Sequence, residues 1–219
     1  MKHDSSGFTL IETAMVLVVI GLLLGAIVRG QELINSSKEK RLARDFKNIP
    51  ASIEGYRDKF RAFPGDDDSL AAHLAGATPC SPPLVAGKCM LGNGMIDGIW
   101  NDSTAASESY VLWQHLRLAG LEGGNTDISN PGDYIPRNII GGQIGIASAS
   151  PIAGLSGTYI ICSDAIPGKF VRQLDIELDD GNTATGFMRA VDAGTTIQAD
   201  PIRTININDD STYLVCLGV

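Results

Sequence analysis

The sequence predicts an α+β protein in which a long N-terminal helix packs on a small antiparallel β-sheet domain with extended loops. Three observations predict this class: a nearly uninterrupted apolar run at residues 8–28, a helical repeat of apolar residues after it, and short strand-like segments in the C-terminal half. The 219 residues are enough for one substantial domain with an appended element. A net charge of −8 without a long basic stripe in the C-terminal part argues against a nucleic-acid partner.

The apolar run at residues 8–28 predicts a helix that can cross a bilayer, because its 21 residues extend roughly 30 Å as a helix. A secretory signal peptide usually has a shorter apolar region, with small residues at a cleavage site after it. Here the small residue, Gly7, precedes the run. A processing signal at Gly7 would therefore lie on the cytoplasmic side of the helix.

Glu12 is the one charged residue within this run. A carboxylate inside a membrane segment costs about 3 kcal/mol on insertion scales, so it normally has a partner and a purpose. Cleavage after Gly7 would free the amino group of Phe8, and in a packed bundle that amine would pair with Glu12 of a neighbouring copy. The alternative is an interfacial glutamate near a helix end that reaches water.

The segment from Gly7 to Glu12, GFTLIE, resembles the prepilin signature of type IV pilins and of type II secretion pseudopilins. The resemblance implies cleavage after Gly7 by prepilin peptidase and N-methylation of Phe8. It also implies that Glu12 sets the register between subunits through a neighbour's Phe8 amine. The partners it implies are other pilin subunits, prepilin peptidase and an inner-membrane assembly platform.

Gly21 and Gly25 form a G-x-x-x-G pair in the same helix. Such a pair lets two helices approach closely in a membrane or in a filament core, so both residues belong to the predicted assembly surface. Ordinary use of glycine in a membrane helix remains the alternative.

The segment after the apolar run is rich in basic residues, which bears on topology. Taken alone, the positive-inside rule would place this side of the helix in the cytoplasm. The leader motif and the cysteines indicate the opposite topology, with the protein in the inner membrane before assembly and in a periplasmic or cell-surface filament afterwards. The basic residues are Arg29, Lys38, Lys40, Arg41, Arg44 and Lys47.

A second helical segment follows, because apolar residues recur at intervals of four and three from Leu42 to Phe60. Pro50 is expected to kink this helix or to begin a second piece, and Phe63-Pro64-Gly65-Asp66 is expected to end it. The chain is thus predicted to comprise a leader at 1–7, a transmembrane or filament-core helix at 8–28, an amphipathic stalk helix at 29–63 and a globular extracytoplasmic domain at 64–219.

The globular domain is predicted from local patterns. A loop-rich tract occupies about 64–105, and Ser107 to Leu121 predicts a short helix with Ser107 as its cap and Gly120 as its stop. β-branched and aromatic residues favour strands, and Phe170, Leu174 and Leu178 favour a helix. The strands are expected at 158–163, 187–191 and 212–217, and the helix at 167–178.

The four cysteines match no close metal-ligand spacing. Locality favours a disulfide between Cys80 and Cys89, and a second one that joins the strand-like segments of Cys162 and Cys216. An oxidising compartment on the far side of the membrane agrees with disulfides, whereas four free, buried thiols are the alternative.

No cofactor is expected, although several acidic turns offer the oxygen ligands that Ca²⁺ prefers. Asp97, Asp179 and Asp180 are the selected calcium candidates, and solvated turns or helix caps are the alternative. None of these segments has the EF-hand spacing. The wider set of candidates also contains Asp66, Asp67, Asp68, Asn93, Asn101 and Asp102.

Catalysis has no recognisable constellation in this sequence. The G-x-S-x-G, H-E-x-x-H and Walker patterns are missing from it. His3, His73 and His115 are far apart along the chain, and His115 is expected to be a packed or surface residue. We therefore expect a structural subunit that assembles into a pilus or secretion-associated filament. The alternative is a membrane-anchored extracytoplasmic binding module that does not polymerise.

The resemblance extends more weakly into the globular domain. Several short motifs are similar to those of a subgroup of uncharacterised prepilin-type proteins, which implies a shared domain without an assigned activity. They are PGD at 64–66, GNG at 92–94, ESY at 108–110, WQHL at 113–116 and LDDGN at 178–182.

Overall fold

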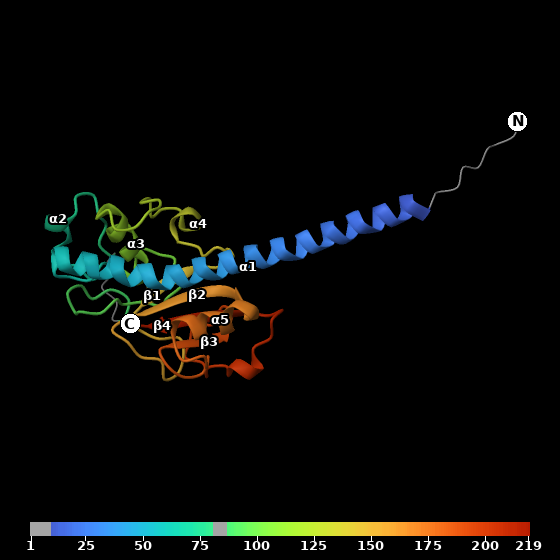
Figure 1. Cartoon of the computed structure of the whole chain (residues 1–219). Coiled ribbons are helices and arrows are strands. Elements are labelled where there is room, and N and C mark those ends of the chain that lie inside the picture. The colour runs from blue at the N-terminus through green and yellow to red at the C-terminus, as the bar shows by residue number, and fades with distance from the viewer. Residues whose placement is uncertain (1–9, 81–86) are drawn as a thin grey trace, which may run out of the picture. The chain divides into compact units, whose positions relative to one another are not determined.

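The computed structural model describes residues 10–80 and 87–219 (Figure 1). By their internal contacts the residues divide into two units, Met1–Lys40 and Arg41–Val219. The second unit contains the folded domain, with four strands and several short helices. The predicted α+β class, a long N-terminal helix and a small antiparallel sheet, is confirmed.

Helix α1 extends from Leu10 to Phe60. It continues through Pro50, so the expected second helical piece does not form. A proline removes one backbone hydrogen bond, but Ile49 and Ile53 on either side of Pro50 are buried and hold this part of the helix in the domain. The helix ends just before Arg61, whose positive φ of 58° leaves the helical region.

Four antiparallel strands form one sheet in the order β1-β2-β4-β3. Three of the strands lie where sequence patterns predict them. The fourth, β1, was not predicted, because Gly142 and Gly145 dilute its apolar pattern. The backbone carbonyl of Trp100 approaches Gly145 so closely that a Cβ there would collide with it. The strands are β1 Ile144–Ala147, β2 Ile160–Pro167, β3 Met188–Asp192 and β4 Thr212–Gly218.

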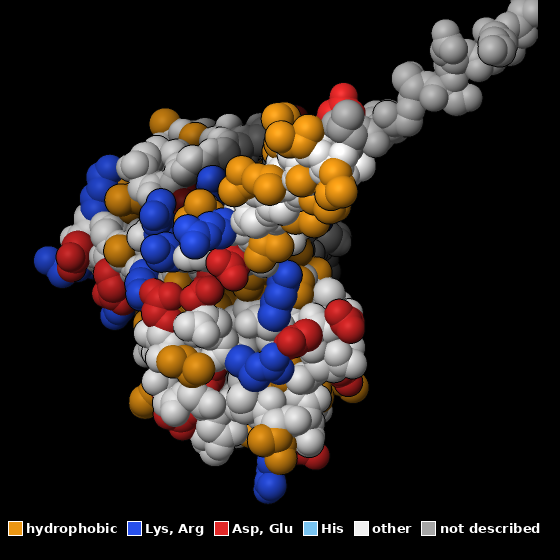
Figure 2. All heavy atoms as spheres, turned by 45° about the vertical axis from the view of Figure 1, so that its right-hand side comes forward, with side chains coloured by type: hydrophobic (Ala, Val, Ile, Leu, Met, Phe, Trp, Pro, Cys, Tyr) orange, Lys and Arg blue, Asp and Glu red, His pale blue; other side chains and the backbone are white. Residues whose placement is uncertain are grey.

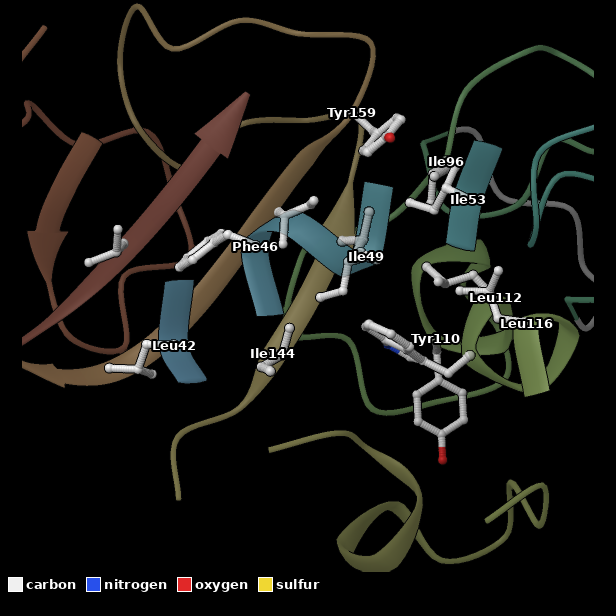
Figure 3. Close-up of a cluster of buried hydrophobic side chains, with 14 of the residues drawn as sticks. Leu42, Phe46, Ile49, Ile53, Ile96, Tyr110, Leu112, Leu116, Ile144 and Tyr159 are labelled. Atoms are coloured by element: carbon white, nitrogen blue, oxygen red, sulfur yellow. The ribbon is translucent and has the colours of Figure 1, made fainter. Parts of the chain in front are cut away.

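The larger core lies on one face of this sheet. Phe46, Ile49 and Ile53 of α1 are buried in it together with residues of the sheet and of helix α3, Glu108–Leu118 (Figure 3). Helix α5, Gly168–Leu178, contributes Phe170 and Leu174 to the same core. A smaller cluster contains the alternate residues of the strands, as expected for period-two side-chain alternation. It comprises Trp100, Ile152, Leu155, Ile160, Cys162, Val191, Leu214 and Cys216.

Helix α3, Glu108–Leu118, confirms the predicted short helix and its glycine stop. Gly120 has a φ of 76° and donates its N–H to Arg117, and the Leu121 N–H bonds to the Leu116 carbonyl, which together form a Schellman motif. Ser107 occupies the N-cap position, but its hydroxyl makes no capping bond. It donates to the Asp97 carbonyl at 3.2 Å instead.

The remaining helical pieces are short: α2 Leu70–His73, α4 Pro131–Tyr134 and the 3₁₀ turn Thr204–Asn206. Both cysteine pairs are disulfide-bonded, Cys80 to Cys89 and Cys162 to Cys216. Cys162 and Cys216 are cross-strand partners of β2 and β4, with Cα atoms 4.1 Å apart.

Candidate functional site

The predicted processing residues, Gly7 and Phe8, lie outside the described residues. The description begins at Leu10, which opens α1, and Glu12 is exposed in the first turn of this helix. Thr13 beside it donates its hydroxyl to the Leu10 carbonyl at 3.0 Å. This helix end is the region that the sequence assigns to subunit registration.

The apolar side chains of α1 from Leu10 to Val28 are exposed, from 46% at Ile20 to 89% at Leu10. Figure 2 shows hydrophobic side chains gathered over this part of the helix. At Gly21 and Gly25, no atom of the described residues outside the local helix lies within 4 Å of the position that a Cβ would take. The helix is also long and apolar enough to cross a membrane. Lipid or other protein copies would have to cover this surface.

A group of buried acidic side chains lies within the folded domain, near the end of α1. Asp66 accepts hydrogen bonds from the backbone N–H groups of Asn93 at 3.0 Å and of Gly94 at 2.7 Å. Asp67 accepts from the Tyr56 hydroxyl and contacts His73 Nδ1, both at 2.8 Å. The PGD and GNG motifs therefore meet through a carboxylate and backbone amides, a pattern that fixes loops.

Glu108, at the start of α3, belongs to the same region and is fully buried. Its two oxygens accept the N–H groups of Met90 at 2.7 Å and Asp97 at 2.9 Å. Burial raises the pKa of Glu108 to about 7, the amide bonds oppose this shift, and the charges of Asp66 and Asp97 add to it. Because both of its oxygens accept backbone amides, Glu108 holds the loop that contains Met90 and Asp97 against α3.

His115 is packed rather than on the surface, which is one of the two alternatives that the sequence predicts. Its Nδ1 accepts the Gly65 N–H at 2.9 Å, so the neutral ring carries its proton on Nε2, which faces the Thr78 carbonyl at 2.9 Å. Burial lowers the pKa of His115, against the opposing effects of the Thr78 carbonyl and the Asp67 charge. Both ring nitrogens are thus used in holding loops to α3.

A second acidic group lies where α5 ends. One ligand atom from each of Asp175, Asp179 and Asp180 lies within 4.8 Å of the others. Asp179 and Asp180 were predicted calcium candidates, whereas Asp175 was not. The third candidate, Asp97, is outside this group and accepts a hydrogen bond from the Asn93 side chain at 3.0 Å.

An open groove of about 740 Å³ lies in the folded domain between α1, α3 and the segment that leads into β1. Arg41 and Arg137 contribute positive charge to it, and Asp45 and Glu122 contribute negative charge. Trp113 adds an aromatic ring to the lining. The groove thus presents a surface of mixed charge to solvent.

The comparisons with known proteins concern the N-terminal helix. Residues 2–28 match the model of the prokaryotic N-terminal methylation motif. This motif is the signature of type IV pilins and pseudopilins, so the resemblance seen in the sequence is confirmed over these residues. Searches of curated proteins and of solved structures found no match.

Proposed function

We propose that this chain is a structural subunit of a type IV pilin-like filament and that it assembles through the N-terminal part of α1. The observation that supports the proposal most strongly is the coincidence of two features. The methylation motif covers residues 2–28, and every large apolar side chain between Leu10 and Val28 is exposed in the single chain. Such a surface needs a lipid or protein environment.

Assembly would exchange one apolar environment for another. Before assembly, residues 8–28 cross the inner membrane, and prepilin peptidase cleaves after Gly7 so that Phe8 becomes the methylated N-terminus. During assembly the helices leave the bilayer and pack against one another, with Gly21 and Gly25 allowing close approach. Because a charge in such surroundings is costly, pairing of Glu12 with a neighbour's Phe8 amine would set the register between copies.

The folded domain supports an extracytoplasmic location. Its two disulfides, Cys80–Cys89 and Cys162–Cys216, persist in oxidising compartments such as the periplasm and the cell surface. This agrees with a helix whose N-terminal end is processed on the cytoplasmic side. Energy for extraction from the membrane would come from a separate ATPase at the assembly platform, since the sequence has no Walker pattern.

The length of the chain favours a pilin or a minor subunit over a major pseudopilin. After removal of the leader at 1–7, the mature chain is longer than we expect for a major pseudopilin of type II secretion. The loop-rich globular domain at 64–219 would form the outer surface of a filament.

A second candidate function is a membrane-anchored binding module that uses the helix only as a tether. The mixed-charge groove between α1 and α3 favours it, because a tethered module needs a recognition surface on its folded domain. Glu12 and the Phe8 amine would then have no role beyond membrane insertion.

Glu12→Ala tests the proposal, with Glu32→Ala as the matched control on the same helix outside the apolar segment. If pairing with the neighbour's amine contributes about 1.4 kcal/mol or more per subunit, Glu12→Ala lowers incorporation into isolated filaments about tenfold or more. The control should assemble normally, and immunoblotting should find both variants in the membrane. Normal incorporation of Glu12→Ala would contradict the pairing, whereas absence of the wild-type chain and of both variants from filaments would favour the tethered module.

A further inference from the structure

The strongest unexplained feature of the folded domain is the acidic group at the end of α5. Asp175 lies in the last turns of this helix, Asp179 occupies its C-cap position, and Asp180 begins the following turn. One oxygen from each carboxylate lies within 4.8 Å of the other two. Three negative charges are therefore held in a space of about the size of one coordinated ion.

Two of the three carboxylates are held in place by the turn before β3. Asp179 Oδ2 accepts the Met188 N–H at 2.7 Å. Asp180 accepts the Asn182 N–H at 2.8 Å and the Thr185 hydroxyl at 2.7 Å. These bonds orient both side chains before any ligand arrives.

Gly186 supports this arrangement through its backbone conformation. Its φ is 69°, and a Cβ there would collide with the Asp179 carboxylate. Only a glycine meets both conditions without strain. The turn is thus shaped around the carboxylate of Asp179.

Asp175 differs from its two neighbours because the described residues give its carboxylate no hydrogen bond of normal geometry. Its side chain is fully buried, and neither carboxylate oxygen accepts a hydrogen bond from the described residues within normal bonding geometry. Burial raises the pKa of Asp175 to about 7, the charges of Asp180 and Asp179 contribute, and the Gly181 amide opposes the shift. A buried carboxylate needs compensation by a proton or a cation.

No protein cation acts on Asp175 among the groups that shift its pKa. The charge of Arg189 acts on the neighbouring Asp180. Its guanidinium is directed elsewhere, because it donates to the Ala153 carbonyl at 2.8 Å and to the Gly186 carbonyl at 3.4 Å. The compensation of Asp175 is then a proton or a cation that these basic groups do not supply.

We propose that Asp175, Asp179 and Asp180 form a binding site for one Ca²⁺ ion. Carboxylate oxygens are the hard ligands that Ca²⁺ prefers, and its flexible coordination accepts an irregular set of three carboxylates completed by water. The exposed side of Asp180 provides the opening for these waters. Mg²⁺ demands a near-ideal octahedron and suits this irregular set less well.

The bound ion would join the end of α5 to the turn that leads into β3. This inference goes beyond the proposed filament function, because the site lies wholly within the folded domain and does not depend on assembly. It keeps two of the three calcium candidates from the sequence, Asp179 and Asp180, adds Asp175 and leaves Asp97 out.

Calorimetric titration of the full chain in detergent at pH 7 with CaCl₂ tests the site, with melting curves in CaCl₂ and in EDTA. We expect one ion per chain, a higher Tm in Ca²⁺ than in EDTA, and weaker binding of MgCl₂. Asp175→Asn and Asp180→Asn should each weaken Ca²⁺ binding about tenfold or more, because each removes a charged ligand. Asp58→Asn, which removes an exposed charge on α1, is the control and should bind normally.

A wild-type chain without Ca²⁺-dependent heat or Tm shift would overturn the proposal. If Asp175→Asn then also raises the Tm in EDTA, a proton is the countercharge of Asp175. Binding that survives both substitutions would overturn the ligand assignment, and equal affinity for Mg²⁺ would overturn the assignment to Ca²⁺. Should Asp175→Asn fail to fold, the exposed Asp180→Asn decides alone.

Discussion

The two halves of α1 both contain large apolar side chains, in opposite surroundings. In the N-terminal half Leu17 is 69% exposed, whereas in the C-terminal half Phe46 is 2% exposed and packs in the domain core. The sequence pattern predicts this difference. Apolar residues occupy all sides of the helix in the first half, whereas in the second half they recur every three or four residues along one side. A helix that is apolar on all sides is covered by lipid or by other copies, whereas an amphipathic helix packs its apolar side against its own chain.

Truncation of one large apolar residue in each half should show the largest contrast. Phe46→Ala removes a buried aromatic side chain and should cost about 3–5 kcal/mol in the free energy of unfolding of the domain. Leu17→Ala should change that quantity by less than about 0.5 kcal/mol, because it removes no contact within the domain. Denaturant unfolding followed by near-UV circular dichroism measures both, and equal losses would contradict the division of roles.

A smaller contrast concerns the pH dependence of stability. The C-terminal half of α1 packs near His115, and the ring centroids of His115 and Tyr56 lie 6.4 Å apart. Burial lowers the pKa of His115 below its usual 6.5 in the folded state. As the pH falls, this histidine therefore becomes protonated in the unfolded chain before it does so in the folded chain. The free energy of unfolding decreases as the pH falls below 6.5. Above pH 6.5 this residue contributes no pH dependence.

His115→Asn isolates this contribution, since asparagine does not titrate. The raised pKa of Glu108 acts oppositely, making folding less favourable as the pH rises toward 7, but it is common to both proteins. The difference in unfolding free energy between wild type and variant should therefore shift in favour of the variant from pH 7 to pH 5. If the difference in unfolding free energy stays constant with pH, His115 has the same pKa in the folded and in the unfolded chain, which would contradict this account.

Local patterns predicted most of the fold. Residues 158–163, 187–191 and 212–217 overlap β2, β3 and β4, and periodicity placed α3 and α5 within a few residues. Strand β1 was missed because its Gly145 serves a close contact with Trp100, which depends on tertiary structure. The continuity of α1 through Pro50 likewise depends on packing against the domain rather than on local preference.

The candidate sites were predicted less completely, because burial is not visible in a sequence. Asp179 and Asp180 were found from their acidic turn, whereas Asp175 lies beside Leu174 in an amphipathic helix and resembles a solvated residue. The spacing of Asp175 four and five residues before Asp179 and Asp180, across a helix end, was the available signal. Glu108 was known only as part of a motif, and its bonds to Met90 and Asp97 required the fold.

The mature N-terminus of the chain in isolated surface filaments tests the central claim most directly. Mass spectrometry of these filaments should find this protein beginning at Phe8, with a methyl group on its amine. A chain that begins at Met1 or after Val28 has no Phe8 amine to offer Glu12 of a neighbour. That result, or filaments without this chain, would contradict assembly through the exposed half of α1.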